Sequence, residues 1–385
     1  PPLVRSLLGH NIGRMSLTAD RRGVLLPHQL LDSKAETTRG GVHWGGVMLN
    51  VIRTIPIDAI TEGSDRLESR LGLDYVGIPD RAAGDPVSIT LARDNLRVVL
   101  LSGVHELVTS TDGIQYYGRQ AVGLGPSSLS LDDDGTRAWV TGRFADTVSL
   151  VQLSPLEVLA TISLGPTPRL TSIDRGEQLF NDSRLSSDGW ISCRSCHTRG
   201  HTNGGLSDTL GDGGFGAPKK VLSLLGSGTT GPWAWNGEVK TLSEQVAKSV
   251  KLTMRGDTMT PRDARDIAAY LKSLPTAPSV ARARGTHDVK AVARGRVVFQ
   301  RTGCAGCHSP PTYTSSRTYD VGISDELGRR RFNPPSLRGV SQRDGLFHDN
   351  RARDLGEVIG RFGHGLKTPL DAADRAVLLQ FLESL

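Results

Sequence analysis

Alternation between apolar and polar residues dominates the first third of the chain. Three segments share one pattern: an alternating run that ends in Asp, a turn, and a second apolar run. Alternation with a period of two predicts strands, so each segment predicts two antiparallel strands joined by a turn. The segments are Met15–Asp20 with Val24–Leu26, Ser88–Asp94 with Val98–Leu101, and Ser128–Asp134 with Ala138–Val140.

The spacing of these segments indicates a repeat. Leu91 and Leu131 are 40 residues apart, which is a period typical of β-propeller blades. Leu17 and Leu91 are 74 residues apart, which fits two blades or one blade with an insertion around Ser33–Asn50. The pattern resembles YVTN-type β-propeller repeats, in which Phe144–Val151 would form a strand pair.

We therefore expect residues 1–168 to form a partial β-propeller of three to four blades, with a β-sandwich as the alternative. The resemblance implies that a closed ring needs more blades, commonly seven. A longer polypeptide or a second protein chain would then complete the propeller.

The remainder of the chain changes to a helical period. Apolar residues recur at i, i+3, i+4 and i+7 within Ile267–Leu274 and, 111 residues later, within Leu378–Leu385. This stripe predicts two amphipathic helices. Two further helical starts, Arg175–Phe180 and Arg294–Phe299, each carry a Gly that would let another helix cross closely.

The chain has only four Cys, and they form two copies of C-x-x-C-H at residues 193–197 and 304–308. This is the attachment signature of c-type haem, because two thiols bind the porphyrin and the following His binds iron. A zinc site or a redox C-x-x-C is the alternative, but neither explains a trailing His in both copies. We predict two covalently bound haem c groups. Their predicted binding residues are Cys193, Cys196, His197, Cys304, Cys307 and His308, with His197 and His308 as iron ligands.

A helix, the motif, loops and a closing helix are the layout of a class I cytochrome c domain. The layout predicts one such domain at residues 169–275 and a second at 289–385. Residues 276–288, rich in Pro, Ala and Arg, are the predicted linker. The expected fold is therefore multidomain, with all-β propeller-like blades followed by two mainly α cytochrome c domains.

Three stretches around the motifs carry a more specific resemblance. They resemble the bacterial diheme cytochrome c peroxidase/MauG superfamily over about residues 170–385. In that family one haem reacts with peroxide or a similar oxidant and the other relays electrons. The resemblance implies a peroxidase-like oxidoreductase whose partner is a small cytochrome or cupredoxin. The stretches are Leu185–Cys193, Trp235–Glu238 with Leu242–Gln245, and Pro335–Val340 with Phe347–Asp349.

The sixth ligand of each iron decides what the haem can do. Counted from the His of each motif, Met254 lies 57 residues on and His364 lies 56 residues on. Such similar separations favour Met254 and His364 as the two distal ligands, with Met259 as the rival of Met254. We discount His201, because the short chain after the first motif keeps it on the proximal side. Typical family members carry Met on the carboxy-terminal haem, so the roles of the two haems would be reversed, or both irons would be six-coordinate.

Peroxide cleavage also needs a group that moves a proton. The resemblance assigns this role to Glu244, and Glu357 holds the matching place in the second copy. The alternative is that both are solvated residues in the first turn of a helix. Trp233 and Trp235 are either electron relays between the haems or buried packing residues.

The composition of the chain restricts the class of protein and its expected partners. Apolar residues make up 37% of the 385 residues and charged residues 22%, which is typical of a globular protein. No apolar run is long enough to span a bilayer. The net charge of +6 comes from scattered Arg, densest at Arg329–Arg331, without interleaved aromatic residues, so nucleic acid is not an expected partner. The histidines of the first third are expected at the surface, with a copper or other metal site as the alternative: His10, His28, His43 and His105.

Covalent haem attachment occurs on the export side of the bacterial membrane, so we expect a periplasmic or extracellular protein. Since the chain starts at Pro1 without Met, we expect a mature form or a fragment of a longer protein. The leading functional hypothesis is a diheme peroxidase/MauG-like enzyme. The alternatives are a diheme electron-transfer subunit of a larger periplasmic complex without its own substrate chemistry, and a scaffold protein whose propeller binds a partner.

Overall fold

The computed structural model describes residues 6–61, 70–112, 118–166 and 169–385. The chain divides into two compact units, Pro1–Thr198 with Met254–Met259, and Arg199–Thr253 with Thr260–Leu385. The first C-x-x-C-H motif therefore belongs to the first unit and the second motif to the second unit. None of the helices in the described ranges is both long and apolar enough to cross a membrane.

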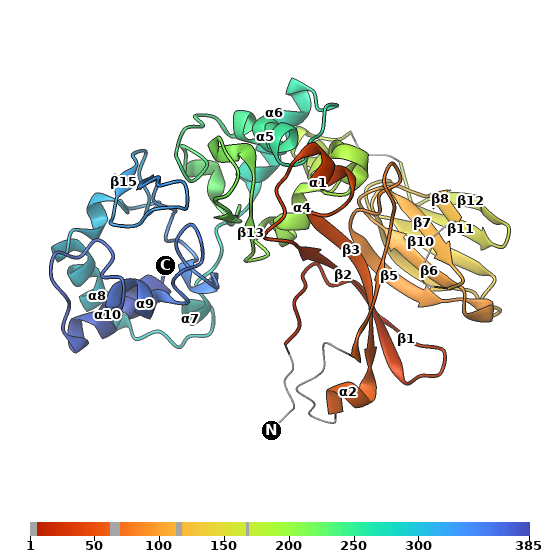
Figure 1. Cartoon of the computed structure of the whole chain (residues 1–385), viewed down its shortest axis with the longest axis horizontal. Coiled ribbons are helices and arrows are strands. Elements are labelled where there is room, and N and C mark those ends of the chain that lie inside the picture. The colour runs from red at the N-terminus through yellow and green to blue at the C-terminus, as the bar shows by residue number, and fades with distance from the viewer. Residues whose placement is uncertain (1–5, 62–69, 113–117, 167–168) are drawn as a thin grey trace. The chain divides into compact units, whose positions relative to one another are not determined.

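Three four-stranded antiparallel sheets make up most of the first unit, coloured red to yellow in Figure 1. Within each sheet the strands pair in chain order, so each sheet is an up-and-down meander. The strands predicted from alternation are confirmed. The first sheet is β1 (Ser16–Leu17), β2 (Gly23–Leu31), β3 (Met48–Pro56) and β4 (Gly72–Tyr75); the second is β5 (Pro86–Leu91), β6 (Arg97–Leu101), β7 (Glu106–Ser110) and β8 (Gly118–Ala121); the third is β9 (Pro126–Leu131), β10 (Arg137–Gly142), β11 (Thr147–Leu153) and β12 (Leu156–Ser163).

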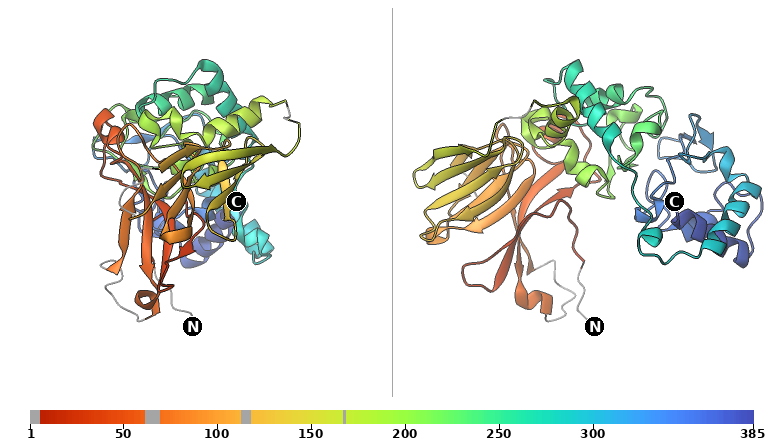
Figure 2. Two further views of the ribbon diagram at one scale, coloured as in Figure 1. Left: turned by 90° about the vertical axis from the view of Figure 1, so that its right-hand side faces the viewer. Right: turned by 180° about the vertical axis from the view of Figure 1, so that it is seen from behind.

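The second sheet contributes side chains to a buried cluster on each of its two faces. Figure 2 shows the strands of the sheets stacked on one another. Val99 of β6 packs into a cluster that contains Ile52 of the first sheet. Its neighbour Leu100 points to the opposite face and packs with Val140 of the third sheet. Because side chains alternate along a strand, only a continuous apolar run such as that of β6 can serve both cores.

The sheets also explain why the spacing between the repeated segments is irregular. Leu17 and Leu91 lie in the first strands of successive sheets, so the offset of 74 residues is one sheet with an insertion. Helix α1 (Arg39–His43) lies in this insertion, and α2 (Ile57–Thr61) follows β3. The predicted strand pair at Phe144–Val151 is wrong. A turn closed by the bond from Ala145 N to Gly142 O leads instead into the single strand β11.

Two histidines expected at the surface are buried instead. His28 is 2% exposed and accepts a hydrogen bond at Nε2 from Arg53 Nε, 3.1 Å away. Desolvation lowers the pKa of His28 to about 4, so its ring is neutral at pH 7. His105 is 6% exposed and accepts a hydrogen bond at Nδ1 from Gly125 N. Both histidines are therefore buried and hydrogen-bonded. Nothing in the local sequence around them indicates this burial.

The predicted helices are confirmed. The two apolar stripes lie in α6 (Pro261–Ser273) and α10 (Ala372–Glu383), and the two helical starts lie in α3 (Ser172–Phe180) and α8 (Val289–Arg301). A capping box at Thr260 and a Pro at the first helical position begin α6. The other elements are α4 (Cys193–Cys196), α5 (Leu242–Leu252), α7 (Val280–Ala283), α9 (Leu355–Gly360), and the two-residue strand pairs β13 (Leu206–Ser207) with β14 (Lys219–Lys220) and β15 (Tyr319–Asp320) with β16 (Arg331–Phe332).

Helices α8 and α10 cross closely at Gly295, as the glycine in Arg294–Phe299 predicted. A Cβ atom at this position would lie 2.0 Å from the carbonyl oxygen of Val377, so only glycine permits the contact. The close approach lets Phe299 pack on Phe381, with ring centres 5.2 Å apart, in the core of the second unit. This core supports the second C-x-x-C-H motif, because Cys304 packs against it.

Candidate functional site

The first motif is a single helical turn, α4. Ser192 caps it: its hydroxyl accepts from Ser195 N at 3.2 Å, and Ser195 Oγ accepts from Ser192 N at 2.9 Å. The bond from His197 N to Cys193 O closes the turn at 2.9 Å. Since residues three apart share a helix face, Cys193 and Cys196 lie on one side of the turn. Desolvation raises the pKa of both thiols to about 12, so both are protonated in the haem-free chain.

A buried carboxylate holds this turn in place. Asp85 is 1% exposed, and its two oxygens accept hydrogen bonds from Ser192 Oγ at 2.6 Å and from Ser195 Oγ at 3.0 Å. His10 Nε2 lies 2.8 Å from the carbonyl oxygen of Ser195, and Asn11 Nδ2 donates to the same oxygen at 3.2 Å. Loops of the sheets therefore fasten the first motif. The sequence did not predict this role of Asp85. The only local sign of it is that two serines, Ser192 and Ser195, flank the first Cys of the motif and need a hydrogen-bond acceptor.

Met254 lies beside the approach to the first motif, in the same compact unit. Its carbonyl oxygen accepts a hydrogen bond from Ser187 N at 3.0 Å, and Ser187 precedes Cys193 by six residues. Met254 is 4% exposed, whereas its rival Met259 is only partly buried. The assignment of either sulfur to the iron stays a prediction.

The second motif fixes the tautomer of its histidine. His308 Nδ1 lies 3.1 Å from the carbonyl oxygen of Tyr313, so this nitrogen carries the proton and donates it. The other nitrogen, Nε2, is left with a free lone pair, as a metal ligand requires. Burial lowers the pKa of His308 to about 4, which keeps the ring neutral at pH 7.

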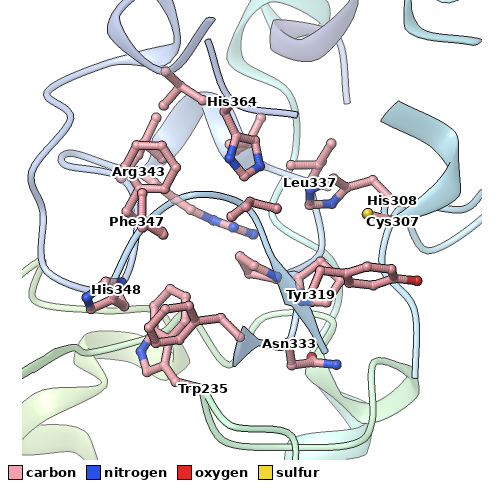
Figure 3. A pocket seen from close by; sticks show the side chains of 18 of the residues that line it. Trp235, Cys307, His308, Tyr319, Asn333, Leu337, Arg343, Phe347, His348 and His364 are labelled. Carbon is pink, nitrogen blue, oxygen red and sulfur yellow. The ribbon is translucent and has the colours of Figure 1, made fainter. Parts of the chain in front are cut away.

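A cavity opens beside His308, and Figure 3 shows the side chains around it. The space, including its opening to solvent, measures about 760 Å³. Its walls are mainly apolar. They are formed by Trp235, Cys307, His308, Tyr319, Val321, Ile323, Phe332, Asn333, Pro334, Pro335, Leu337, Val340, Arg343, Leu346, Phe347, His348, Leu355, Val358 and His364.

His364 faces His308 across this cavity (Figure 3). The two ring centres are 6.4 Å apart, with 58° between the ring planes. A metal–imidazole bond is about 2 Å, so two imidazoles on opposite sides of one metal have ring centres roughly 6 Å apart. Among the described residues nothing hydrogen-bonds the buried Nδ1 of His364, and burial lowers the pKa of this ring. The pair therefore fits a haem iron held between two neutral imidazoles.

Trp235 forms another wall of the cavity, although we had assigned it to the first haem domain. Its indole nitrogen donates to Lys220 O at 3.0 Å, and its carbonyl oxygen accepts from Asn333 N at 2.8 Å. The indole also meets the ring of His348 edge-on, with centres 6.3 Å apart. Lys220, which binds the Trp235 indole, also donates from Nζ to Gly345 O at 2.8 Å. Lys220 therefore connects Trp235 to the loop that carries His348.

The two predicted acid–base residues both lie in first turns of helices. Glu244 is exposed in a capping box, where its carboxylate accepts from Thr241 N at 3.1 Å. Glu357 pairs with Arg353, whose Nε donates to it at 2.8 Å, and this bond lowers the pKa of Glu357. Neither lines the cavity of the second motif. His201, which we discounted as a ligand, hydrogen-bonds to Ser223 Oγ at 2.7 Å.

The chain is similar to known diheme proteins. The profile of the family described as di-haem cytochrome c peroxidase matches residues 171–294. The methylamine utilization protein MauG of Methylorubrum extorquens is 24% identical over 278 residues, covering 54% of this chain and 76% of MauG. Cytochrome c551 peroxidase of Nitrosomonas europaea is 24% identical over 262 residues, covering 54% of this chain and 78% of that protein.

A third relative is the gamma subunit of hydrazine synthase from Kuenenia stuttgartiensis. It is 24% identical over 270 residues, covering 54% of this chain and 76% of the subunit. A solved structure of hydrazine synthase from the same organism covers 60% of this chain and 99% of its own, with a TM-score of 0.51 and 21% identity. This likeness extends to the fold of the region that carries the motifs.

The motifs and these similarities together define an oxidoreductase that uses haem c. Residues 171–294 thus match the di-haem cytochrome c peroxidase family, and the chain is similar to MauG and to a cytochrome c peroxidase.

Replacing Asp85 tests how the first motif is held. In Asp85→Ala, two buried hydroxyls lose their acceptor, so the free energy of unfolding should fall by about 1–3 kcal/mol. Haem incorporation at the first motif should fall more than at the second. Denaturant unfolding and haem content measure both effects. Asp133→Ala, at an exposed carboxylate between β9 and β10, is the control and should change neither. Equal behaviour of the two variants would contradict a supporting role for Asp85.

Proposed function

We propose that this chain is a diheme peroxidase/MauG-like oxidoreductase with one covalently bound haem c at each C-x-x-C-H motif. The observation that supports a haem at the second motif is the pair of imidazoles of His308 and His364, whose ring centres face each other 6.4 Å apart. Bound haem supplies the electron exchange and the reaction with peroxide or a similar oxidant. The protein supplies the ligands, the mainly apolar cavity and the proton transfer.

The thiols of each motif attach one haem, and His197 and His308 are its proximal ligands. His364 is the sixth ligand at the second site and Met254 at the first, with Met259 as the alternative. Met/His ligation raises a reduction potential, and replacing Met by His lowers it. The first site therefore has the higher potential, which reverses the order of typical family members.

Electrons enter from a small cytochrome or cupredoxin. Trp235 is the proposed relay, because its indole lies in the wall of the second cavity while its segment follows the first motif in the chain. Trp233 is a weaker candidate, since it is outside that cavity wall and its indole donates to Ser227 O at 3.1 Å.

Glu244 is the proposed acid–base group at the first site. Its carboxylate is exposed and makes one hydrogen bond to the backbone, so it remains free to exchange protons with water. Glu357 would serve the second copy less well, because its bond to Arg353 stabilises the ionised form and lowers its pKa.

The amino-terminal sheets support a partial propeller, because four-stranded meanders packed face to face are its blades. We propose that this part spans residues 1–168 and that a longer polypeptide or a second chain completes the ring. The cytochrome c domains would follow at 169–275 and 289–385, joined by the linker at 276–288. Covalent haem places the protein in the bacterial periplasm or outside the cell.

A second candidate function is electron transfer within a larger periplasmic complex, without substrate chemistry of its own. Two imidazoles on one iron would leave no open position there, which favours relay over catalysis at the second site. The similarity to a subunit of hydrazine synthase points in the same direction.

Denatured protein tests the haem count. We expect the mass of the unfolded chain to exceed that of the bare polypeptide by two haem groups, because thioether bonds survive denaturation. Cys193→Ala and Cys307→Ala should each impair attachment at one motif only. A mass equal to the bare polypeptide would contradict both attachment sites.

Glu244→Gln separates catalysis from capping. Glutamine serves in a capping box as well as glutamate, so the melting temperature and both haem spectra should stay unchanged. Loss of the acid–base group should slow peroxide turnover by about 10²–10⁴-fold. Glu238→Gln, at an exposed glutamate of the same segment, is the matched control and should keep full activity. Unchanged turnover in Glu244→Gln would leave Glu244 with capping alone, and peroxide-inert wild type would favour the electron-transfer function.

A further inference from the structure

Three potential metal ligands that belong to neither Cys motif meet in the first unit. Ligand atoms of His43, Asp80 and Asp188 all lie within 4.8 Å of one another. They come from three separate segments: His43 ends α1, Asp80 lies in the loop between β4 and β5, and Asp188 precedes Cys193 by five residues. His43 Nδ1 is 2.7 Å from Asp188 Oδ2.

No Arg or Lys of the described ranges forms an ion pair with either carboxylate of this cluster. Throughout the described ranges, the only ion pair of Asp188 is the one with His43, and Asp80 has none. Two carboxylates this close repel each other when both are ionised. The side chains of His43 and Asp188 are 36% and 17% exposed, so a small ion can reach them from solvent.

We propose that His43, Asp80 and Asp188 bind a divalent first-row transition-metal ion. One imidazole nitrogen with two carboxylate oxygens suits zinc and its neighbours, because imidazole favours these ions over calcium and magnesium. Three protein ligands leave a fourth position of a tetrahedral site for water. The ion would also neutralise the two facing carboxylates.

The ion would tie together the segments that enclose Trp190. The Trp190 indole nitrogen donates to His43 O at 2.9 Å. Its ring also packs on the backbone of two glycines: a Cβ atom at Gly45 would lie 3.0 Å from it, and one at Gly77 would lie 3.1 Å from it. Trp190 and Asp188 both belong to the chain that leads into Cys193, so metal binding would hold the approach to the first motif rigid.

Zinc binding to the haem-loaded, chelator-treated full chain tests this site. We expect isothermal titration with Zn²⁺ to show one equivalent bound. His43→Ala and Asp80→Asn should each weaken binding by at least about 10–100-fold, the loss that even outer partners of metal ligands produce. Each variant should keep the haem absorption spectrum of the wild type, which shows that the first unit remains folded.

Asp257→Asn is the matched control, because Asp257 is a 70% exposed carboxylate of the same unit outside the cluster. It should bind zinc as the wild type does. The proposal is overturned if the wild type binds no zinc, or if His43→Ala binds it as tightly as the wild type. Competition by equimolar calcium or magnesium would overturn the assignment to a transition metal.

Discussion

The proposed second haem site depends on one hydrogen bond, from Nδ1 of His308 to the carbonyl oxygen of Tyr313 at 3.1 Å. This bond fixes the ring proton on Nδ1 and leaves the lone pair of Nε2 for a metal. Burial keeps the imidazole neutral, and the walls of the cavity beside it are mainly apolar. A charged His308, or one protonated on Nε2, would lose the Nε2 lone pair, and the facing position of His364 would then serve no iron.

Different interactions support the two copies of the motif: hydrogen bonds hold the first, and apolar packing holds the second. A buried carboxylate, Asp85, holds the first copy through the hydroxyls of Ser192 and Ser195, so loops of the sheets secure it. The second copy rests on an apolar helical core, where Gly295 allows α8 and α10 to touch. This difference explains why the first motif belongs to one compact unit with the sheets, whereas the second lies with the helices.

Local periodicity was enough to predict the strands and the amphipathic helices, and both Cys motifs could be read directly from the sequence. Similar spacing from the motif made His364 a candidate ligand, and the structure places it opposite His308; its role as a ligand stays a prediction. Contacts between distant segments have no such period. The sequence therefore could not predict the burial of His105, the support by Asp85, or the position of Trp235 in the wall of the second cavity. Each of these depends on how loops fold back onto a core built elsewhere in the chain.

The proposed ligation of one iron by His308 and His364 is tested most directly by electron paramagnetic resonance of the oxidised, haem-loaded protein. We expect a low-spin signal from the second haem, because two imidazoles give a strong axial field. In His364→Ala this signal alone should convert to high spin, while that of the first haem stays as in the wild type. A high-spin second haem in the wild type, or a spectrum unchanged by His364→Ala, would contradict the assignment.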